Sequence, residues 1–164
     1  MKQDPFEALY HRLKDKVYST ALRLCGRRDQ ALDASQDVFI KLYDKRKAWE
    51  AGELTDAYIY RMTVNRCLDF KRNEKRLVQL DTAMPDNRRS GANRVDDEDE
   101  VERLLSILNP EQRTAVVLQE ISGLSYDEIA AATDTDIGTV RSRLSRAKDK
   151  MKEVYLRLQK EKLP

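Results

Sequence analysis

The stretch at residues 125–151, SYDEIAAATDTDIGTVRSRLSRAKDKM, decides the fold of the C-terminal part of this chain. Ser125 and Glu128 have the Ser-x-x-Glu spacing of a capping box, which predicts that a helix begins at this point. Asp134 tolerates the left-handed backbone of a tight turn, and Asp136 is a suitable N-cap for a second helix that starts at Ile137. The stretch is therefore predicted to form a helix-turn-helix.

The second of these helices has one apolar side and one basic side. Its apolar residues recur at alternating steps of three and four, and they are Ile137, Val140, Leu144, Ala147, Met151, Val154 and Leu158. Between residues 141 and 162 there are nine basic side chains and three acidic ones. Most charged helical faces are merely solvated, but a net charge of +6 on one helix behind a capped turn favours contact with nucleic acid.

Hydroxyl and guanidinium groups project together from the early turns of this helix, and such groups suit DNA. Arg can bind guanine bidentately, Ser and Thr can reach bases or phosphates, and Lys neutralises backbone charge. The predicted DNA-contacting residues are Thr139, Arg141, Ser142, Arg143, Ser145, Arg146 and Lys150.

Length and composition indicate an all-α protein made of two small helical domains. Charged residues make up 37% of the 164 positions, with five Gly and four Pro, which favours helices over a β-rich fold. No apolar stretch approaches the ~18 residues of a membrane span and no secretory leader is recognisable, so we expect a cytoplasmic protein without membrane insertion. Cys25 and Cys67 lack a Cys-x-x-Cys partner and are expected to be buried free thiols.

The apolar periodicity fades between about residues 73 and 95, where Pro, Gly, Ser and Asn appear. We therefore expect an N-terminal domain at residues 1–73, a flexible linker at residues 74–97 and the helix-turn-helix domain at residues 98–164. The acidic run at residues 96–100 directly precedes a helical pattern, so its charges suit a helix N-terminus better than a metal site. No metal or other cofactor is expected.

The N-terminal domain is predicted to hold three helices. The first begins with Asp4 as N-cap and Pro5 at its first position, and it ends at Gly26. The second spans about residues 29–44 and is expected to direct Leu32, Phe39, Leu42 and Tyr43 to the core. Its other side carries Asp33, Gln36, Asp37, Ile40 and Asp44. Carboxylates around an exposed Ile suit a basic protein partner, although a solvated face with one stray Ile explains the same spacing as well.

The third helix, at about residues 55–71, carries the polar line Arg61, Asn65, Asp69 and Arg72. An Asn flanked by Arg residues can bind an unstacked base while the cations hold phosphate. The preceding loop at residues 47–55 would take part in capturing that base. Hydrogen bonds and ion pairs along a solvated helix explain the same residues equally well.

Four blocks of this sequence resemble the extracytoplasmic-function sigma factors of bacterial RNA polymerase, over nearly the whole chain. Residues 33–39, DASQDVF, resemble the helix with which this family docks on the clamp coiled coil of the largest polymerase subunit. Residues 65–69, NRCLD, resemble the segment that melts and reads the minus-ten promoter element. Residues 123–130 with 138–147 resemble the signature that reads the minus-thirty-five element, and residues 109–113, NPEQR, resemble the start of the preceding helix.

The resemblance assigns a role to each of these faces. It implies that Asp33, Gln36, Asp37 and Ile40 bind core polymerase, and that Tyr58, Arg61, Asn65, Asp69 and Arg72 contact the minus-ten element. Tyr58 stands where many members have Trp, and Thr133-Asp134-Thr135 stands where the family often has Gly. The implied partners are core RNA polymerase, through its clamp and flap, promoter DNA and an anti-sigma factor.

Two other function classes compete with this resemblance. A stand-alone helix-turn-helix regulator would act as a symmetric dimer on palindromic sites and would need no polymerase. A net charge of only +2 gives little nonspecific grip on DNA, which favours dependence on polymerase. An enzyme is not expected, because His11 is the single His and the carboxylates follow helical charge patterns.

Overall fold

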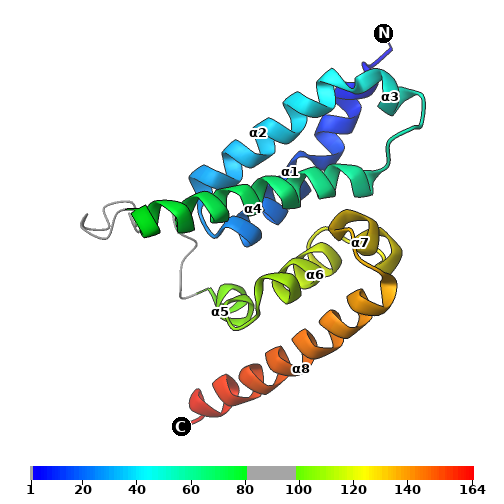
Figure 1. Cartoon of the computed structure of the whole chain (residues 1–164). Coiled ribbons are helices and arrows are strands. Elements are labelled where there is room, and N and C mark those ends of the chain that lie inside the picture. Colours follow the sequence, from blue (N-terminus) through cyan, green and yellow to red (C-terminus); the bar gives the residue numbers. More distant parts are fainter. Residues whose placement is uncertain (1, 81–98) are drawn as a thin grey trace.

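A computed structural model of the chain describes residues 2–80 and 99–164, and their regular structure consists of eight α-helices (Figure 1). The helices are α1 (Pro5–Cys25), α2 (Arg28–Asp44), α3 (Arg46–Glu50), α4 (Asp56–Leu80), α5 (Glu100–Ser106), α6 (Pro110–Glu120), α7 (Tyr126–Thr133) and α8 (Ile137–Glu161). The prediction of an all-α chain with two helical parts is confirmed. Part of the expected linker, residues 81–97, lies outside the described residues.

The N-terminal half is a bundle in which α1, α2 and α4 pack against one another. The α1 helix begins where Asp4 accepts a hydrogen bond from the Phe6 amide at 3.0 Å. It ends at Gly26, whose positive φ of 71° lets the chain turn back into α2. The α1 helix places Leu9, Leu13, Val17, Ala21 and Leu24 in the core.

The core-facing side of α2 differs from the prediction. Leu32 is 51% exposed and Tyr43 is 47% exposed, whereas Phe39 and Leu42 are buried as expected. The core positions of α2 are instead led by Ala31, Ala34, Ser35 and Val38, which lie on one side at helical spacing. Small residues allow α2 to approach its neighbours closely, so the buried face is centred on them and leaves Leu32 and Tyr43 outside.

The α4 helix is longer than the sequence suggested. It continues to Leu80, so residues 74–80 are helical rather than part of a linker that begins at residue 74. This segment contains no Gly or Pro, and Glu74 accepts a hydrogen bond from the Gln30 side chain of α2 at 2.6 Å. Good helix formers and a tertiary contact therefore carry the helix past the point where apolar periodicity fades.

The C-terminal half contains the predicted helix-turn-helix. Both hydrogen bonds of the Ser125 and Glu128 capping box are present, at 3.2 and 3.0 Å. Asp134 has the left-handed conformation, with φ 53° and ψ 48°, and Asp136 caps α8 by accepting from the Thr139 amide at 2.7 Å. The apolar side of α8, which we call its seam, is most deeply buried at Val140, Leu144 and Ala147, where it packs on α6 and α7.

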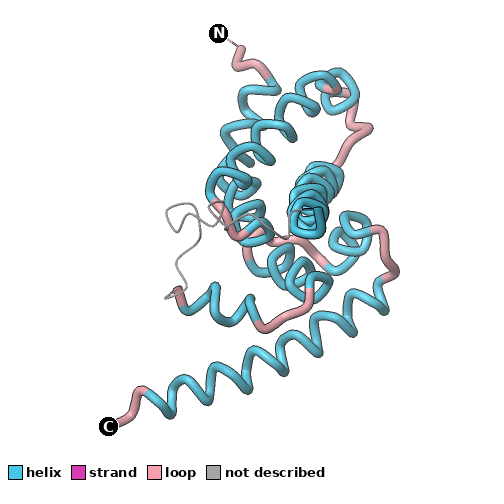
Figure 2. The backbone as a smooth tube through the Cα atoms, turned by 60° about the vertical axis from the view of Figure 1, so that its left-hand side comes forward, coloured by secondary structure: helices cyan, strands magenta, loops and turns pink. Residues whose placement is uncertain are grey.

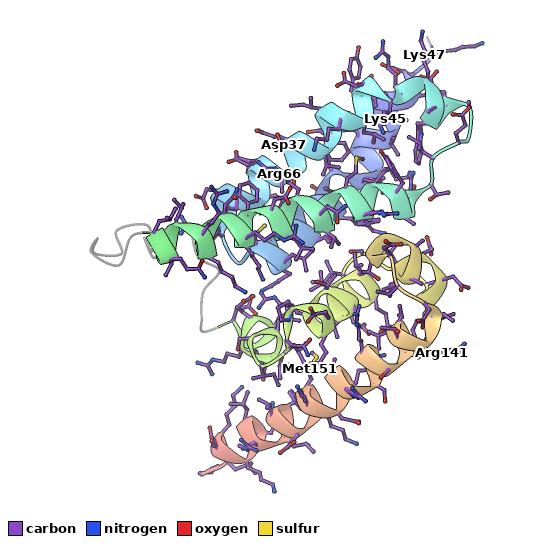
Figure 3. All side chains as sticks on the ribbon, in the orientation of Figure 1. Asp37, Lys45, Lys47, Arg66, Arg141 and Met151 are labelled. Carbon is purple, nitrogen blue, oxygen red and sulfur yellow. The ribbon has the colours of Figure 1, made fainter. Side chains whose placement is uncertain are left out.

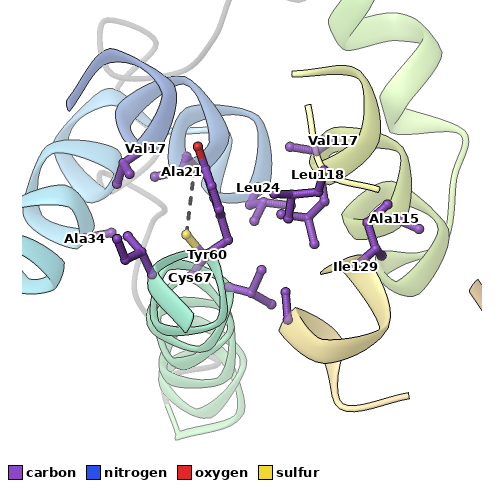
Figure 4. Packing of buried hydrophobic residues seen from close by; sticks show 14 of the residues in the cluster. Val17, Ala21, Leu24, Ala34, Tyr60, Cys67, Ala115, Val117, Leu118 and Ile129 are labelled. Atoms are coloured by element: carbon purple, nitrogen blue, oxygen red, sulfur yellow. Dashed lines mark hydrogen bonds between the residues drawn. The ribbon is translucent and has the colours of Figure 1, made fainter. Parts of the chain in front are cut away.

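The two halves pack on each other and share one apolar core. The α4 helix contacts α7 and α1 contacts α6, so the C-terminal half packs on both of these N-terminal helices (Figure 1, Figure 2). Figure 4 shows Leu24 of α1 beside Val117 and Leu118 of α6, and all three belong to the same buried cluster as Tyr60 and Ile129. A domain of about 65 residues buries its apolar surface incompletely when alone, so each half covers part of the other.

Polar groups are paired inside this interface. The buried hydroxyls of Thr20 and Ser122 are 2.7 Å apart and form a hydrogen bond. Arg23 donates to Asp99 at 2.8 Å, while Arg113 donates to Glu102 at 2.7 Å and to the Arg23 carbonyl at 2.7 Å. Because buried polar groups are costly when unpaired, this network favours one fixed arrangement of the halves.

Candidate docking and nucleic-acid surfaces

The outer side of α2 presents the residues expected to bind a protein partner. Asp33, Gln36 and Ile40 are exposed, with Ile40 at 62%, and Asp37 is partly exposed. Leu32 and Tyr43, which the sequence placed in the core, lie on this same side of the helix. We call Leu32, Asp33, Gln36, Asp37, Ile40 and Tyr43 the α2 stripe. Its two additional apolar members follow the spacing of Gln36 and Ile40, which is the signal that sequence reasoning overlooked.

The α2 stripe is tied to α4 by one ion pair. The Arg66 Nε donates to Asp37 Oδ2 at 2.6 Å, and Figure 3 shows these two side chains meeting between the helices. Beside them is a groove of about 120 Å³, lined by Asp37, Val38, Lys41, Met62, Asn65, Arg66 and Asp69. The groove thus joins the α2 stripe to the polar line of α4.

The polar line of α4 is exposed as predicted. Arg61, Asn65, Asp69 and Arg72 face solvent, whereas Tyr58 is half-buried. Asp69 and Arg72 approach to 3.8 Å, so this part of the line also contains the ion pair that a simple solvated helix would have. Arg61 lies 3.8 Å from Asp134 in the turn before α8, so one end of the line touches the C-terminal half.

The segment before α4 adds a cation that the sequence did not reveal. The expected loop at residues 47–55 begins with the short helix α3, and Trp49 packs against the core. The Lys45 ammonium donates to the Tyr58 hydroxyl at 2.7 Å and lies 5.2 Å from the centre of the Tyr58 ring. Lys45 and Tyr58 are thirteen positions apart in sequence, so the spacing within one helix does not predict their contact.

The basic side of α8 faces away from the core. Arg141, Ser142, Ser145, Arg146 and Lys150 are exposed, and Thr139 and Arg143 are half-buried. Figure 3 shows Arg141 projecting away from the core. Lys150 donates to the Gln112 side chain at 3.3 Å, so its ammonium is partly engaged within the C-terminal half. The cap at Asp136 and the buried seam fix the rotation of α8, and that rotation directs the basic side outward.

The interior holds few groups suited to chemistry. Cys25 and Cys67 are buried, as expected, and the Cys67 thiol donates to the Ala21 carbonyl at 4.0 Å. The neighbouring Cys25 thiol, together with burial, raises the pKa of Cys67. Burial beside Asp56 also raises the pKa of Tyr60 to about 12. Within residues 2–80 and 99–164, no cluster of His, Cys, Asp and Glu is suited to a metal ion. In the same described residues, no helix has the length and apolar character to cross a membrane.

Comparison with known families matches both halves of the chain. The family model described as Sigma-70 region 2 matches residues 9–77, and the model described as Sigma-70, region 4 matches residues 98–151. The chain is 31% identical to the ECF RNA polymerase sigma-E factor of Escherichia coli K12 in an alignment 162 positions long, which covers 90% of this chain and 84% of that protein. It is also 31% identical to the ECF RNA polymerase sigma factor SigE of Mycolicibacterium smegmatis over 157 residues, but it spans 60% of that longer relative.

Solved structures give the same similarity. The sigma factor RpoE of Bartonella quintana, solved in complex with the anti-sigma factor NepR, superposes with a TM-score of 0.76 at 26% identity. That match covers 92% of this chain and 96% of the other. CnrH, solved with the cytosolic domain of CnrY, has the same fold with a TM-score of 0.68 at 21% identity over 92% of this chain and 86% of that one.

Proposed function

This chain belongs to the extracytoplasmic-function group of the sigma-70 family, and we propose that α2 docks it on core RNA polymerase while α4 and α8 contact two promoter elements. It is thus an RNA polymerase sigma factor, a transcription initiation factor. The assignment of roles to these three helices rests on which of their residues are exposed. The α2 stripe, the polar line of α4 and the basic side of α8 are exposed on three different helices, each within a segment matched by a sigma-70 region.

Docking rests on the mixed character of the α2 stripe. Ile40, Leu32 and Tyr43 offer apolar contact area, and Asp33 and Asp37 offer carboxylates to basic groups of the polymerase clamp. Polymerase contacts through the flap would fall to residues 98–164. Because the structurally similar RpoE was solved in complex with an anti-sigma factor, an anti-sigma factor that covers the α2 stripe is part of this proposal.

Upstream recognition is assigned to the outward side of α8. Its early turns place Arg141, Ser142, Ser145 and Arg146 in solvent, where a helix can enter the major groove of DNA. Arg143 is half-buried between the basic side and the apolar side of α8, so its side chain has less freedom than those of the exposed Arg residues. Guanidinium groups supply base contacts, and Lys150 with the hydroxyl residues supplies contacts to the phosphate backbone.

Strand opening is assigned to α4 and the segment before it. An extruded base would meet the Asn65 amide at the rim of the groove between α2 and α4, while Arg61 and Arg72 hold phosphate. Tyr58 offers a ring for stacking, with Lys45 beside it as a further cation. Asp69 would hold Arg72 in place along the helix. The chain would perform no covalent chemistry itself and would act with polymerase in the cytoplasm.

Purified core polymerase and the purified chain test this proposal by run-off transcription on genomic fragments. We expect discrete transcripts that appear only when the chain is present, and a monomeric chain in solution. Transcripts identical with and without the chain would contradict the assignment. Binding of a symmetric dimer to palindromic DNA without polymerase would favour a stand-alone regulator instead.

A further inference from the structure

The Asp37 carboxylate in the α2 stripe is hydrogen-bonded to a side chain of another helix, α4. Asp37 keeps 41% of its side chain exposed, yet Asp37 Oδ2 accepts a hydrogen bond of 2.6 Å from Arg66 of α4. The two residues are 29 positions apart in sequence and meet at the wall of the groove between α2 and α4 (Figure 3). The orientation of Asp37 is therefore set by α4 rather than by its own helix.

Arg66 is itself restrained on its other side. Its guanidinium carbon lies 4.1 Å from the centre of the Phe70 ring, one helical turn further along α4, and only 28% of the Arg66 side chain is exposed. A guanidinium that is stacked on an aromatic ring and hydrogen-bonded through Nε has few remaining rotamers. A carboxylate bound to it loses less freedom when a second partner arrives, which is the advantage of preorganisation.

The same fold shows that one carboxylate can serve two guanidinium groups. Glu102 accepts from Arg113 at 2.7 Å and from Arg23 at 3.5 Å in the interface between the halves. A carboxylate has several acceptor positions, so a hydrogen bond from Arg66 leaves Asp37 able to bind a further cation. Asp37 remains 41% exposed within the α2 stripe, which is the side of α2 that is proposed to dock.

We propose that Arg66 is a positioning residue for polymerase docking, which holds the Asp37 carboxylate in the orientation that meets a basic group of the clamp. This inference rests on the proposed docking role of Asp37. It assigns Arg66 to the polymerase side of the molecule, although Arg66 follows Asn65 directly in the segment assigned to DNA. Arg66 also neutralises the charge of Asp37, which would weaken docking. Weaker polymerase binding when Arg66 is removed therefore indicates positioning, and tighter binding indicates neutralisation.

The test measures equilibrium binding of the full chain to core polymerase without DNA, for wild type, Arg66→Met, Arg66→Lys, Asp37→Asn and the double variant Arg66→Met with Asp37→Asn. We expect Arg66→Met to weaken binding about fivefold to tenfold and Arg66→Lys to restore part of the loss. In the Asp37→Asn background, Arg66→Met should change nothing further, because Arg66 acts only through Asp37. Thermal unfolding of each variant confirms that it is folded.

Arg12→Met is the matched control. Arg12 forms a bidentate pair with Asp56 at 2.9 and 3.1 Å, which also joins α4 to another helix but lies off the α2 stripe. This variant should lose comparable stability and bind polymerase like wild type.

Each other result overturns the inference in a recognisable way. Wild-type or tighter binding by Arg66→Met, with weakened Asp37→Asn, would show that Arg66 does not position Asp37 and would leave the docking role of Asp37 intact. A full additive loss in the double variant, or a loss in the Arg12→Met control, would indicate a general effect on the fold. Wild-type binding by Asp37→Asn would remove the proposed docking role itself.

Discussion

The two halves of this molecule specify their helices in different ways. Each helix of the C-terminal half begins at a side-chain cap, supplied by Asp99, Asn109, Ser125 or Asp136. In the N-terminal half, α2 and α3 begin without a side-chain cap, and the three long helices are held by their mutual packing. Short-range signals therefore mark the start of each helix in the C-terminal half, whereas in the N-terminal half α1 has such a cap at Asp4 but α2 and α3 depend on packing.

Truncation of the N-terminal core should have the largest effect on stability. Ile59 of α4 is fully buried, so Ile59→Ala should lower the free energy of unfolding by about 2–5 kcal/mol through lost burial and a cavity. The matched control is Ile40→Ala on the exposed side of α2, which should change it by less than about 0.5 kcal/mol. Urea denaturation followed by circular dichroism measures both. Similar losses in the two variants would contradict the burial on which the comparison rests.

The interface between the halves should respond less strongly, but in a diagnostic way. Thr20→Val removes the partner of the Ser122 hydroxyl, which then keeps only a 3.5 Å contact with the Val117 carbonyl. We expect a loss of about 1–3 kcal/mol for a buried hydroxyl left unpaired.

Adding Ser122→Ala to Thr20→Val should recover part of that loss, since no unpaired hydroxyl would remain. Calorimetry of wild type, Thr20→Val, Ser122→Ala and the double variant measures the effect. Strictly additive losses would show that the two hydroxyls do not depend on each other, and the halves would then be separable units.

Removal of a single cap tests the short-range side of the comparison. Ser125→Ala deletes the acceptor for the Glu128 amide and should lower stability by about 1 kcal/mol. Ser125→Asp keeps an acceptor at the same position and should stay close to wild type. Thermal unfolding distinguishes them. If Ser125→Asp lost as much as Ser125→Ala, the hydroxyl would matter for something other than capping.

The smallest expected effect is the pH dependence of the cap on α8. Hydrogen bonds from the Thr139 backbone and side chain lower the pKa of Asp136, so its charged form is favoured in the folded chain. Its contribution to stability is therefore present above the ordinary pKa of Asp, near 4, and is lost as the pH falls through the lowered folded value. Asp136→Asn should be less stable than wild type at pH 7, and the difference should shrink as the pH falls below the ordinary pKa of Asp and through the lowered folded value. A difference that persists unchanged at low pH would exclude this charge effect.

What could be predicted from the sequence follows the same division between short-range signals and long-range packing. Asp134, the two capping residues Ser125 and Asp136, and the buried seam of α8 were predictable because each depends on neighbours within a few positions. The buried face of α2 was not, because the close approach of Ala31 and Ala34 to other helices outweighs the size of Leu32 and Tyr43.

The candidate surfaces divide in the same manner. Exposure of the polar line of α4 and of the basic side of α8 follows from helical spacing. The contacts of Lys45 with Tyr58 and of Arg66 with Asp37 join residues 13 and 29 positions apart, so only the folded chain brings them together. The DNA and polymerase roles of these residues stay predictions.

The most direct test of the whole account is permanganate footprinting of one promoter with core polymerase and each chain, on duplex and on premelted templates. The account predicts that Asn65→Ala reduces opening of duplex DNA but not occupancy of premelted DNA. Arg143→Ala should weaken both by about 1–3 kcal/mol, and only when the upstream element is intact. Equal loss by Asn65→Ala on both templates, or a loss by Arg143→Ala that ignores the upstream element, would contradict the claim that α4 and α8 read separate parts of the promoter.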